Sequence, residues 1–419
     1  MQRRDFIKLA ATGLALAGMP ALSRAATAAQ GRVVVVGGGY AGTTFAKYLR
    51  LWGGEQLEII VVEKNTAFIS CPMSNLVLGG SRSIGELTFN YSGLDRHRIK
   101  RLHESVTGID PEKRRVHVDS GDAIDYDRLV LAPGIDFVWD SLPMLAGEAV
   151  QEIVPHAWKA GPQTVNLRRQ LEAMSDGGVF LMSVPKAPYR CPPGPYERVS
   201  QVAFYMKQHK PRSKIVVLDA NPEIVSKKGL FTRAWADLYP GMIDYRPNSA
   251  VVEVDVAGRS VKTEFDSLRA DVLNIIPPQR AGQVAQIAGV ANVDKRWCEV
   301  DFLTYESKLI PNLHIIGDAV SAALPKSAHL ATSHAKVCAA AVAALMSGEA
   351  PDPQPVFANT CYSFVSDKLA MHVANVYRYD AAKQVMLPAE GGGVSERPSE
   401  QEGRYADGWA QNIWSDVLT

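Results

Sequence analysis

A glycine-rich turn is the first feature whose residue types and spacing point to chemistry. Gly37, Gly39 and Gly42 follow an apolar run at 33–36 and precede a stretch with helical spacing. The first glycine permits the tight turn, the second lets a pyrophosphate approach the backbone, and the third lets the helix meet the strand. The backbone amides of this turn, that of Ala41 included, are expected to bind phosphate.

An acidic residue follows the next apolar run. Glu63 comes directly after the run at 57–62, and its carboxylate can accept hydrogen bonds from both ribose hydroxyls of a dinucleotide. The negative charge argues against a ribose 2′-phosphate at this place. Strand, turn, helix and acid together predict one right-handed parallel crossover unit with a dinucleotide site.

A second signal favours FAD over NAD as that dinucleotide. An apolar run at 313–316 leads into Asp318, and an earlier apolar run leads into Ala132 and Gly134. This order of elements resembles that of the two-dinucleotide disulfide reductases. The resemblance implies that Asp318 meets the ribityl chain of the flavin and that Ala132 and Gly134 belong to the same site. Taken alone, an ordinary strand end followed by a turn is the alternative interpretation.

The five cysteines are the candidates for redox chemistry. They stand at positions 71, 191, 298, 338 and 361, with no CxxC and no CxxCH, so neither zinc ligation nor haem attachment within this chain is well supported, and no metal site is expected. Hydrosulfide and thiolates both attack disulfides, so a cysteine pair beside a flavin offers a route for two electrons from sulfur to the ring. A structural disulfide between domains is the alternative that composition leaves open.

The order of apolar runs predicts an α/β protein with two Rossmann-like three-layer domains of the glutathione reductase type and a small C-terminal α+β domain. An FAD-binding domain is expected at 30–145 and 276–350. The second Rossmann-like domain is expected as an insertion at 146–275, and the C-terminal domain at 351–419.

The second Rossmann-like domain lacks one element that nicotinamide binding requires. Apolar runs at 177–184 and 214–219, with a helical stretch between them, predict its first two strands. Prolines and bulky side chains occupy 184–191, where a second glycine-rich turn would be needed. The domain is therefore predicted to keep the fold without binding NAD(P)H, so electrons must leave to another acceptor.

The first 29 residues have the pattern of a twin-arginine export signal. Arg3 and Arg4 precede a weakly apolar stretch at 9–22, and small residues follow up to Ala28. The apolar stretch is shorter than the roughly 20 residues that cross a bilayer, which favours cleavage near Ala28 over a membrane anchor. The expected location is the periplasm. The formal charge of +1 gives no sign of nucleic-acid binding.

Several uncommon segments resemble the flavoprotein subunit of flavocytochrome c sulfide dehydrogenase, and the similarity covers essentially the whole exported chain. The segments are 70–75, 155–161, 190–198, 276–282 and 359–363. The resemblance implies that FAD is joined to Cys71 through an 8α-thioether and that Cys191 and Cys361 form a redox-active disulfide. Pro72 and Met73 stand where the family has a more polar pair of one aromatic and one aliphatic residue.

Glu197 matches a glutamate that lies near this disulfide in the family. The resemblance implies that its carboxylate handles the proton of hydrosulfide. A surface glutamate that caps its own helix is the alternative. Cys298 also matches the family but has no implied redox role, and Cys338 lies in an alanine-rich helix, where packing is the expected role.

The activity implied by the resemblance is oxidation of sulfide to polysulfide or sulfur, with electrons passed from FAD to a c-type cytochrome subunit that carries the haem. Two alternatives stay open: a sulfide:quinone oxidoreductase, and a non-catalytic accessory flavoprotein of a thiosulfate-oxidising system. The tail at 408–414 is short and mildly amphipathic, with no membrane span expected, which favours a cytochrome partner over a membrane quinone.

Overall fold

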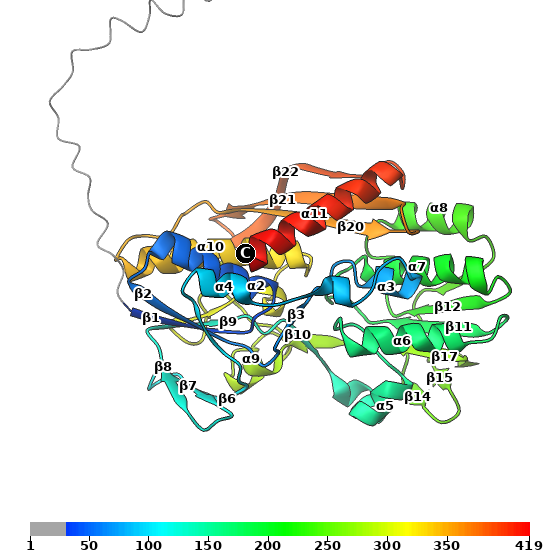
Figure 1. Ribbon diagram of the computed structural model, residues 1–419, viewed down its shortest axis with the longest axis horizontal. Helices are drawn as coiled ribbons and strands as arrows, with labels where there is room; N and C mark the ends of the chain where they lie inside the picture. The colour runs from blue at the N-terminus through cyan, green and yellow to red at the C-terminus, as the bar shows by residue number, and fades with distance from the viewer. Residues whose placement is uncertain (1–30) are drawn as a thin grey trace, which may run out of the picture.

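The computed structural model of the chain describes residues 31–419. The expected export signal and its cleavage site lie outside the described residues. The chain forms two parallel sheets side by side, each with helices, and a third layer that crosses both (Figure 1).

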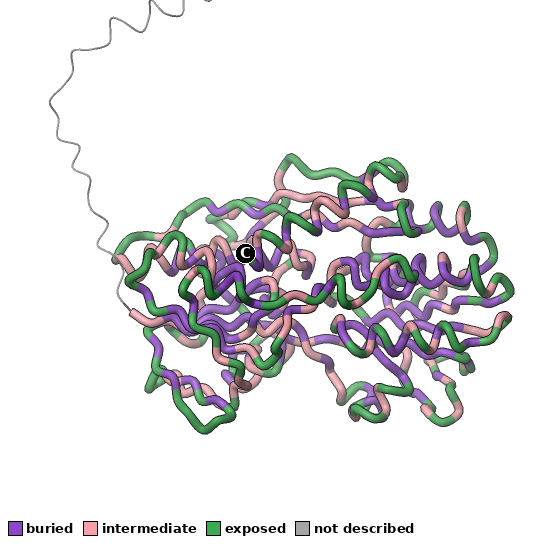
Figure 2. Tube along the Cα trace, in the orientation of Figure 1, coloured by how far each residue is buried: buried purple, intermediate pink, exposed green. Residues whose placement is uncertain are grey.

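The first sheet is built from two parts of the chain that are far apart in sequence. Its five parallel strands are arranged in the order β19-β9-β1-β2-β5. The strands are β1 (Gly31–Val36), β2 (Leu57–Val62), β5 (Lys100–Leu102), β9 (Arg128–Leu131) and β19 (Leu313–Ile315). The central strands are apolar along nearly their whole length because helices and further strands cover both faces of the sheet (Figure 2).

Two long helices pack against each other on one face of this sheet, and a small antiparallel sheet lies on the opposite side (Figure 1). The helices are α2 (Tyr40–Gly53) and α10 (Ala328–Met346); the small sheet is β6 (Val106–Asp110), β7 (Arg115–Val118) and β8 (Ala123–Asp125). Shorter elements complete this part: β3 (Phe68–Ile69), α3 (Asn75–Gly79), β4 (Thr88–Phe89), α4 (Ser92–Arg96), β10 (Ile135–Phe137), β18 (Gln279–Ala281) and α9 (Gln283–Ile287).

The second sheet has four parallel strands in the order β13-β12-β11-β17. The strands are β11 (Val179–Val184), β12 (Lys214–Asp219), β13 (Ile243–Arg246) and β17 (Val272–Ile275). The helices of this part are α5 (Glu148–Ile153), α6 (Pro162–Ala173), α7 (Gly194–His209) and α8 (Lys228–Leu238), and a meander adds β14 (Glu253–Asp255), β15 (Ser260–Lys262) and β16 (Ser267–Arg269). The two predicted strands and the helix between them are therefore present.

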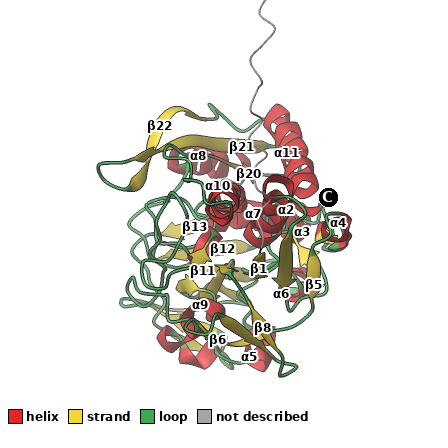
Figure 3. Ribbon diagram, turned by 90° about the vertical axis from the view of Figure 1, so that its left-hand side faces the viewer, coloured by secondary structure: helices red, strands yellow, loops and turns green. Residues whose placement is uncertain are grey.

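The C-terminal part is a three-stranded antiparallel sheet with one helix. Its elements are β20 (Val356–Phe364), β21 (Ala370–Asp380), β22 (Val385–Val394) and α11 (Glu400–Leu418). This layer lies over α2 and α10 of the first unit and over α7 of the second (Figures 1 and 3). The α/β class and the small C-terminal domain are confirmed. Among residues 31–419, no helix combines the length and apolar composition of a membrane span.

Helix α11 is fixed to the first unit by charge as well as by apolar packing. Asp416 accepts hydrogen bonds from the Tyr48 hydroxyl at 2.6 Å and the Lys336 ammonium at 2.7 Å, and Lys47 donates to the carbonyl of Asp416 at 2.8 Å. Since these residues come from α2 and α10, the last helix is held against both helices of the first sheet.

The glycine-rich turn between β1 and α2 shows why each glycine is needed. Gly37 has φ of +108°, and a Cβ added there would lie 2.4 Å from the Ala132 carbonyl oxygen. A Cβ on Gly42 would lie 1.8 Å from the Gly37 carbonyl oxygen, because the helix passes directly over the strand end. At Gly39 an added Cβ meets nothing within 4 Å, so this glycine leaves open space above the backbone.

The turn generates a stability prediction. Gly42→Ala places a methyl group against backbone that cannot move independently, and we expect the free energy of unfolding to fall by about 1–3 kcal/mol. Gly39→Ala is the matched control, with an expected loss of about 0.5 kcal/mol because alanine is the poorer N-cap. Urea unfolding followed by circular dichroism measures both. Equal stability of the two variants would contradict this account of the turn.

Candidate active site

A cavity of about 910 Å³ runs between the first unit, the second unit and the C-terminal layer. All but one of the site residues predicted from the sequence line it: Gly37, Gly39, Ala41, Glu63, Cys71, Ala132, Gly134, Cys191, Glu197, Asp318 and Cys361. The exception, Gly42, packs below the cavity against Gly37, as its role at the helix–strand contact requires. The volume lies in the range typical of cofactor and substrate pockets.

One end of the cavity has the features of a pyrophosphate site. The first turn of α2 has neither a capping side chain nor an acidic residue, so its N–H groups remain available to an anion. Glu63 lies at the end of β2 beside this turn. One of its carboxylate oxygens accepts from the Gly38 amide at 2.5 Å, and the other from the amide of Asn65 at 2.7 Å. These bonds orient the carboxylate towards the place where a ribose would lie.

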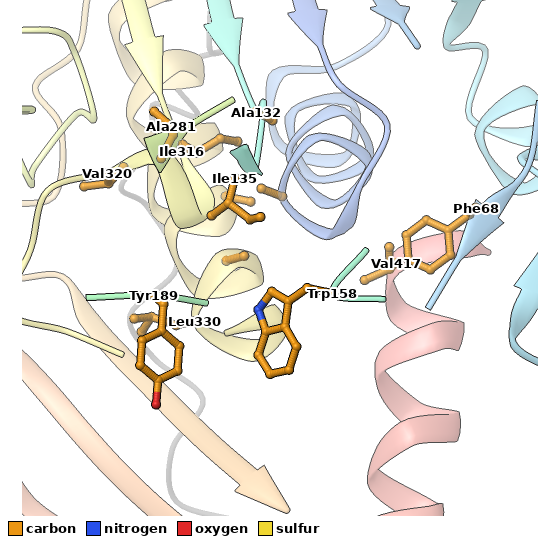
Figure 4. Close-up of a cluster of buried hydrophobic side chains, with 14 of the residues drawn as sticks. Phe68, Ala132, Ile135, Trp158, Tyr189, Ala281, Ile316, Val320, Leu330 and Val417 are labelled. Atoms are coloured by element: carbon orange, nitrogen blue, oxygen red, sulfur yellow. The ribbon is translucent and has the colours of Figure 1, made fainter. Parts of the chain in front are cut away.

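The strand ends of the first sheet form the floor of the cavity. Asp318 follows β19 and is flanked by Arg190 and Lys326; burial raises the pKa of its carboxyl group, while the two cations oppose that rise. Ala132 and Gly134 follow β9, and Gly134 has φ of +61°. Figure 4 shows Ala132 close to buried apolar side chains of neighbouring elements, Ile135, Ala281 and Ile316. An open turn, a free helix N-terminus and an acid on each of two strand ends fit FAD.

Cys71 lies on a loop that hydrogen bonds hold in place from several directions. Ser74 donates to the Cys71 carbonyl at 2.7 Å, and Ser70 donates to the Pro72 carbonyl at 2.8 Å. The Ser70 hydroxyl also receives the indole N–H of Trp414 at 2.9 Å. The partly exposed Cys71 thiol therefore lines the cavity from a rigid backbone.

Cys191 and Cys361 come from different parts of the molecule, the second unit and the C-terminal layer, and both line the cavity. Cys191 has φ of +60° at the entry to α7, where its amide donates to the Lys326 carbonyl at 2.7 Å. Cys361 lies in the middle of β20.

The electrostatics of the pair follow from its burial. Burial raises the pKa of the Cys191 thiol, and the neighbouring Cys361 and Glu197 raise it further. Burial also raises the pKa of Cys361, whereas Lys227 lowers it. Each thiol is therefore harder to ionise than in water unless a positive charge or a proton acceptor assists.

Glu197 connects three parts of the molecule. It lies in the first turn of α7, and its carboxylate accepts from the Phe364 amide of β20 at 2.8 Å and from the Asn75 side-chain amide of α3 at 2.8 Å. Burial raises the pKa of its carboxyl group, and these two bonds oppose the rise. The side chain faces the cavity and bonds to other elements instead of to its own helix.

Two residues of the site were missed in the sequence. Asn75 donates to Glu197, and its carbonyl oxygen accepts from the buried guanidinium of Arg198 at 3.0 Å. Arg198 also donates to the backbone carbonyls of His156 and Ala157, at 3.1 and 2.6 Å. Asn75 lies in a segment that carried the family resemblance, but no spacing rule connects it with a helix 120 residues later.

Two histidines of α10, His329 and His334, differ in their position relative to the cavity. His329 lines the cavity and accepts from the Thr360 amide at 3.0 Å, and burial lowers its pKa. His334 is enclosed between Tyr305 and Phe357, and burial lowers its pKa to about 3. Both are neutral packing groups at neutral pH.

In the second unit, the acid at the end of the second strand is bound by side chains of the protein. Asp219 ends β12, as Glu63 follows β2, but it is fully buried. Its carboxylate accepts from the hydroxyls of Tyr196 and Tyr245, both at 2.8 Å, and from the Asn221 amide at 2.8 Å. The Asp219 carboxylate is thus satisfied within the protein, and the lack of NAD(P)H binding in this unit stays a prediction.

Comparison with known proteins matches three family models to the chain. The model described as pyridine nucleotide-disulphide oxidoreductase matches residues 31–171. The model of the sulfide dehydrogenase (flavocytochrome c) flavoprotein chain, central, matches 164–277. The model of flavocytochrome c sulphide dehydrogenase, flavin-binding, matches 353–418, which supports FAD as the dinucleotide of the cavity.

Individual relatives agree with these models. The chain is 24% identical over 317 residues to the mitochondrial sulfide:quinone oxidoreductase of Dictyostelium discoideum, covering 73% of this chain and 69% of that protein. The solved structure of the sulfide:quinone oxidoreductase from Aquifex aeolicus has the same fold, with a TM-score of 0.73 at 18% identity, covering 92% of this chain and 91% of that one.

A shorter match is much closer. Over 46 residues the chain is 52% identical to the sulfide dehydrogenase (flavocytochrome c) flavoprotein chain of Chlorobaculum thiosulfatiphilum, a stretch that is 11% of this chain and 94% of that sequence. The resemblance seen in the sequence is confirmed: the chain belongs to the family of the flavoprotein chain of flavocytochrome c sulfide dehydrogenase, a family of sulfide-oxidising flavoproteins.

Proposed function

We propose that this chain is a periplasmic sulfide dehydrogenase that oxidises hydrosulfide at Cys191 and Cys361 and delivers the electrons, through FAD, to a c-type cytochrome. The observation that carries the proposal is the meeting of both cysteines and Glu197 in the cavity that also contains the glycine-rich turn and Asp318. The periplasmic location is supported by Arg3 and Arg4 and the apolar stretch after them.

The proposed cycle starts from a disulfide between the two cysteines. Hydrosulfide attacks one sulfur, the Cys191–Cys361 bond breaks, a persulfide forms on the attacked cysteine, and the other cysteine leaves as thiolate. Glu197 accepts the proton of the incoming sulfur. A second hydrosulfide then takes up the outer sulfur as a hydrodisulfide anion, which leaves two reduced cysteines.

Reoxidation of the two thiols to the disulfide releases two electrons and two protons. FAD, when bound, supplies an acceptor that takes electrons in pairs and passes them on singly. The residues that would hold it are the turn at 37–42, Glu63, Asp318 and, through its sulfur, Cys71. The haem must be carried by another chain because the sequence contains no CxxCH.

A cytochrome is favoured over a membrane quinone as acceptor by the packing of α11. The apolar side of this helix, including Ala406, Ala410 and Ile413, is buried against the rest of the protein. An interfacial helix would instead present its apolar side to lipid. The long similarity to sulfide:quinone oxidoreductases keeps quinone reduction as the second candidate.

The first test is sulfide-dependent reduction of a purified soluble cytochrome c by the flavin-loaded protein. Cys191→Ser removes one of the two sulfur atoms, and we expect the rate to fall by about 10³-fold or more, as when a nucleophile is removed. Cys338→Ala, which removes a thiol outside the cavity, should keep the wild-type rate. Reduction of a quinone in lipid vesicles without reduction of cytochrome would assign the protein to the second candidate. If the protein reduces neither cytochrome nor quinone, the result would indicate an accessory role.

A further prediction concerns the pH dependence of sulfide oxidation. Because burial raises the pKa of Glu197 above its ordinary value, its proton-accepting form appears at higher pH than that of an exposed glutamate. We expect Glu197→Gln to lower kcat/KM by about 100-fold above that pKa and to approach wild type below it. The ionisation of sulfide affects both proteins alike, so the ratio of their pH profiles isolates Glu197. A ratio that does not change with pH would show that the carboxylate has no proton-transfer role.

The third prediction concerns the flavin link. If Cys71 forms the thioether, flavin mass stays on the Cys71 peptide after acid denaturation and digestion of the exported protein. In Cys71→Ala the flavin should be released by acid, while Cys298→Ala, at a buried cysteine outside the cavity, should retain it. Peptide mass spectrometry measures all three. Flavin released from the wild-type protein would exclude the covalent link and leave FAD held by the other residues of the site.

A further inference from the structure

Lys227 is a partly buried lysine close to the cysteine pair, and it is not among the residues that line the cavity. It is the residue before α8 and has φ of +55°, an unusual conformation for a lysine. Its ammonium group donates to the Cys361 carbonyl at 2.9 Å and to the Ser363 hydroxyl at 2.8 Å. A side chain of the second unit therefore holds the strand of the C-terminal layer that carries Cys361.

The segment that leads to Lys227 is fixed by the buried acid of the second unit. Tyr196 donates its hydroxyl proton to Asp219 and accepts from the Val225 amide at 3.2 Å. Asn221 donates to Asp219 and to the Pro185 carbonyl. This network fixes the chain two residues before Lys227, so Tyr196 and Asp219 help to direct the lysine at β20.

The charges around the ammonium group are predominantly negative or able to become so. Burial lowers the pKa of Lys227 to about 8, and the nearby acids oppose that fall, so the amine is mostly protonated at neutral pH. The ionisable groups that face this cluster are Cys361 of β20, Tyr377 of β21, Glu197 and Arg198 of α7, Cys191 and Arg190 before α7, and Glu402 of α11. Lys227 is the cation with the largest effect on Cys361, and it also favours ionisation of Cys191.

We propose that Lys227 is a positioning residue for the cysteine pair: its ammonium group fixes the backbone of Cys361 and provides the positive charge that stabilises an anionic sulfur at this pair. The inference deepens the proposed function and rests on it for its role in the reaction. When hydrosulfide opens the disulfide, one S–S bond breaks, one S–S bond forms and the negative charge moves to the displaced cysteine. A fixed cation beside that sulfur favours the displacement without taking part in bond formation.

The test measures the thiol itself and needs no sulfide. Iodoacetamide is reacted with the anaerobically reduced holoprotein from pH 6 to 10, and the mass of the Cys361 peptide gives the alkylation rate at each pH. Lys227→Gln keeps hydrogen-bond donors but removes the charge. Below the Lys227 pKa of about 8, where the wild-type amine is charged, we expect alkylation of Cys361 to be about ten-fold slower in the variant, because only the thiolate reacts. Above that pKa the wild-type amine is neutral, and the two profiles should converge.

Three further variants separate charge from structure. Lys227→Arg should keep the wild-type rate below pH 8, since the charge remains there in both proteins. Lys228→Gln, at the exposed neighbour that pairs with Glu223 at 2.6 Å, should change the rate less than two-fold. Lys227→Met serves as the second neutral variant if Lys227→Gln does not reach the wild-type unfolding midpoint.

The outcomes of the alkylation test can be distinguished from those of the sulfide oxidation assay. A wild-type profile in the neutral variant would overturn the role of Lys227, whatever the activity with sulfide. If the neutral variant changes the profile but the wild-type protein does not oxidise sulfide, the electrostatic role of Lys227 stands and the proposed reaction is rejected.

Discussion

The active cavity depends on one partly buried carboxylate. Glu197 lies in the first turn of α7 in the second unit, receives a hydrogen bond from Asn75 of the first unit, and receives another from Phe364 of the C-terminal layer. A buried carboxylate is costly unless its oxygens are satisfied, so these contacts require all three parts to be in place together. The same requirement brings Cys191, six residues before Glu197, next to Cys361, three residues before Phe364. Assembly of the pair is thus linked to assembly of the whole molecule.

The sequence was sufficient where a signal is local. The turn at 37–42 and Glu63 were predicted because a strand, a turn and a helix that follow one another in the chain must be adjacent in space. Asp318 was predicted in another way, through the resemblance of the order of elements to that of the two-dinucleotide disulfide reductases. The export signal lies outside the described residues and stays a prediction, as do the covalent flavin and the domain boundaries.

The remaining site residues depend on tertiary contacts that no spacing reveals. Lys227 and Lys228 are adjacent, and two adjacent lysines are typical of a charged surface segment. The Lys227 side chain nevertheless enters the protein, whereas the Lys228 side chain stays in solvent. Asn75 supports a helix that begins more than a hundred residues later. The second unit illustrates the same point: the absence of a glycine-rich turn was visible in the sequence, but the hydrogen bonds from Tyr196 and Tyr245 to Asp219 were not.

The position of α11 has a consequence for how the protein matures. Trp409 of this helix lines the cavity, as does Tyr362 of β20, and Asp416 holds the helix against α2 and α10. A chain still emerging from the ribosome has formed the glycine-rich turn but has no wall on this side of the cavity. Cofactor capture is therefore expected to follow completion of the chain. Stable flavin binding would then indicate that the final helix is folded.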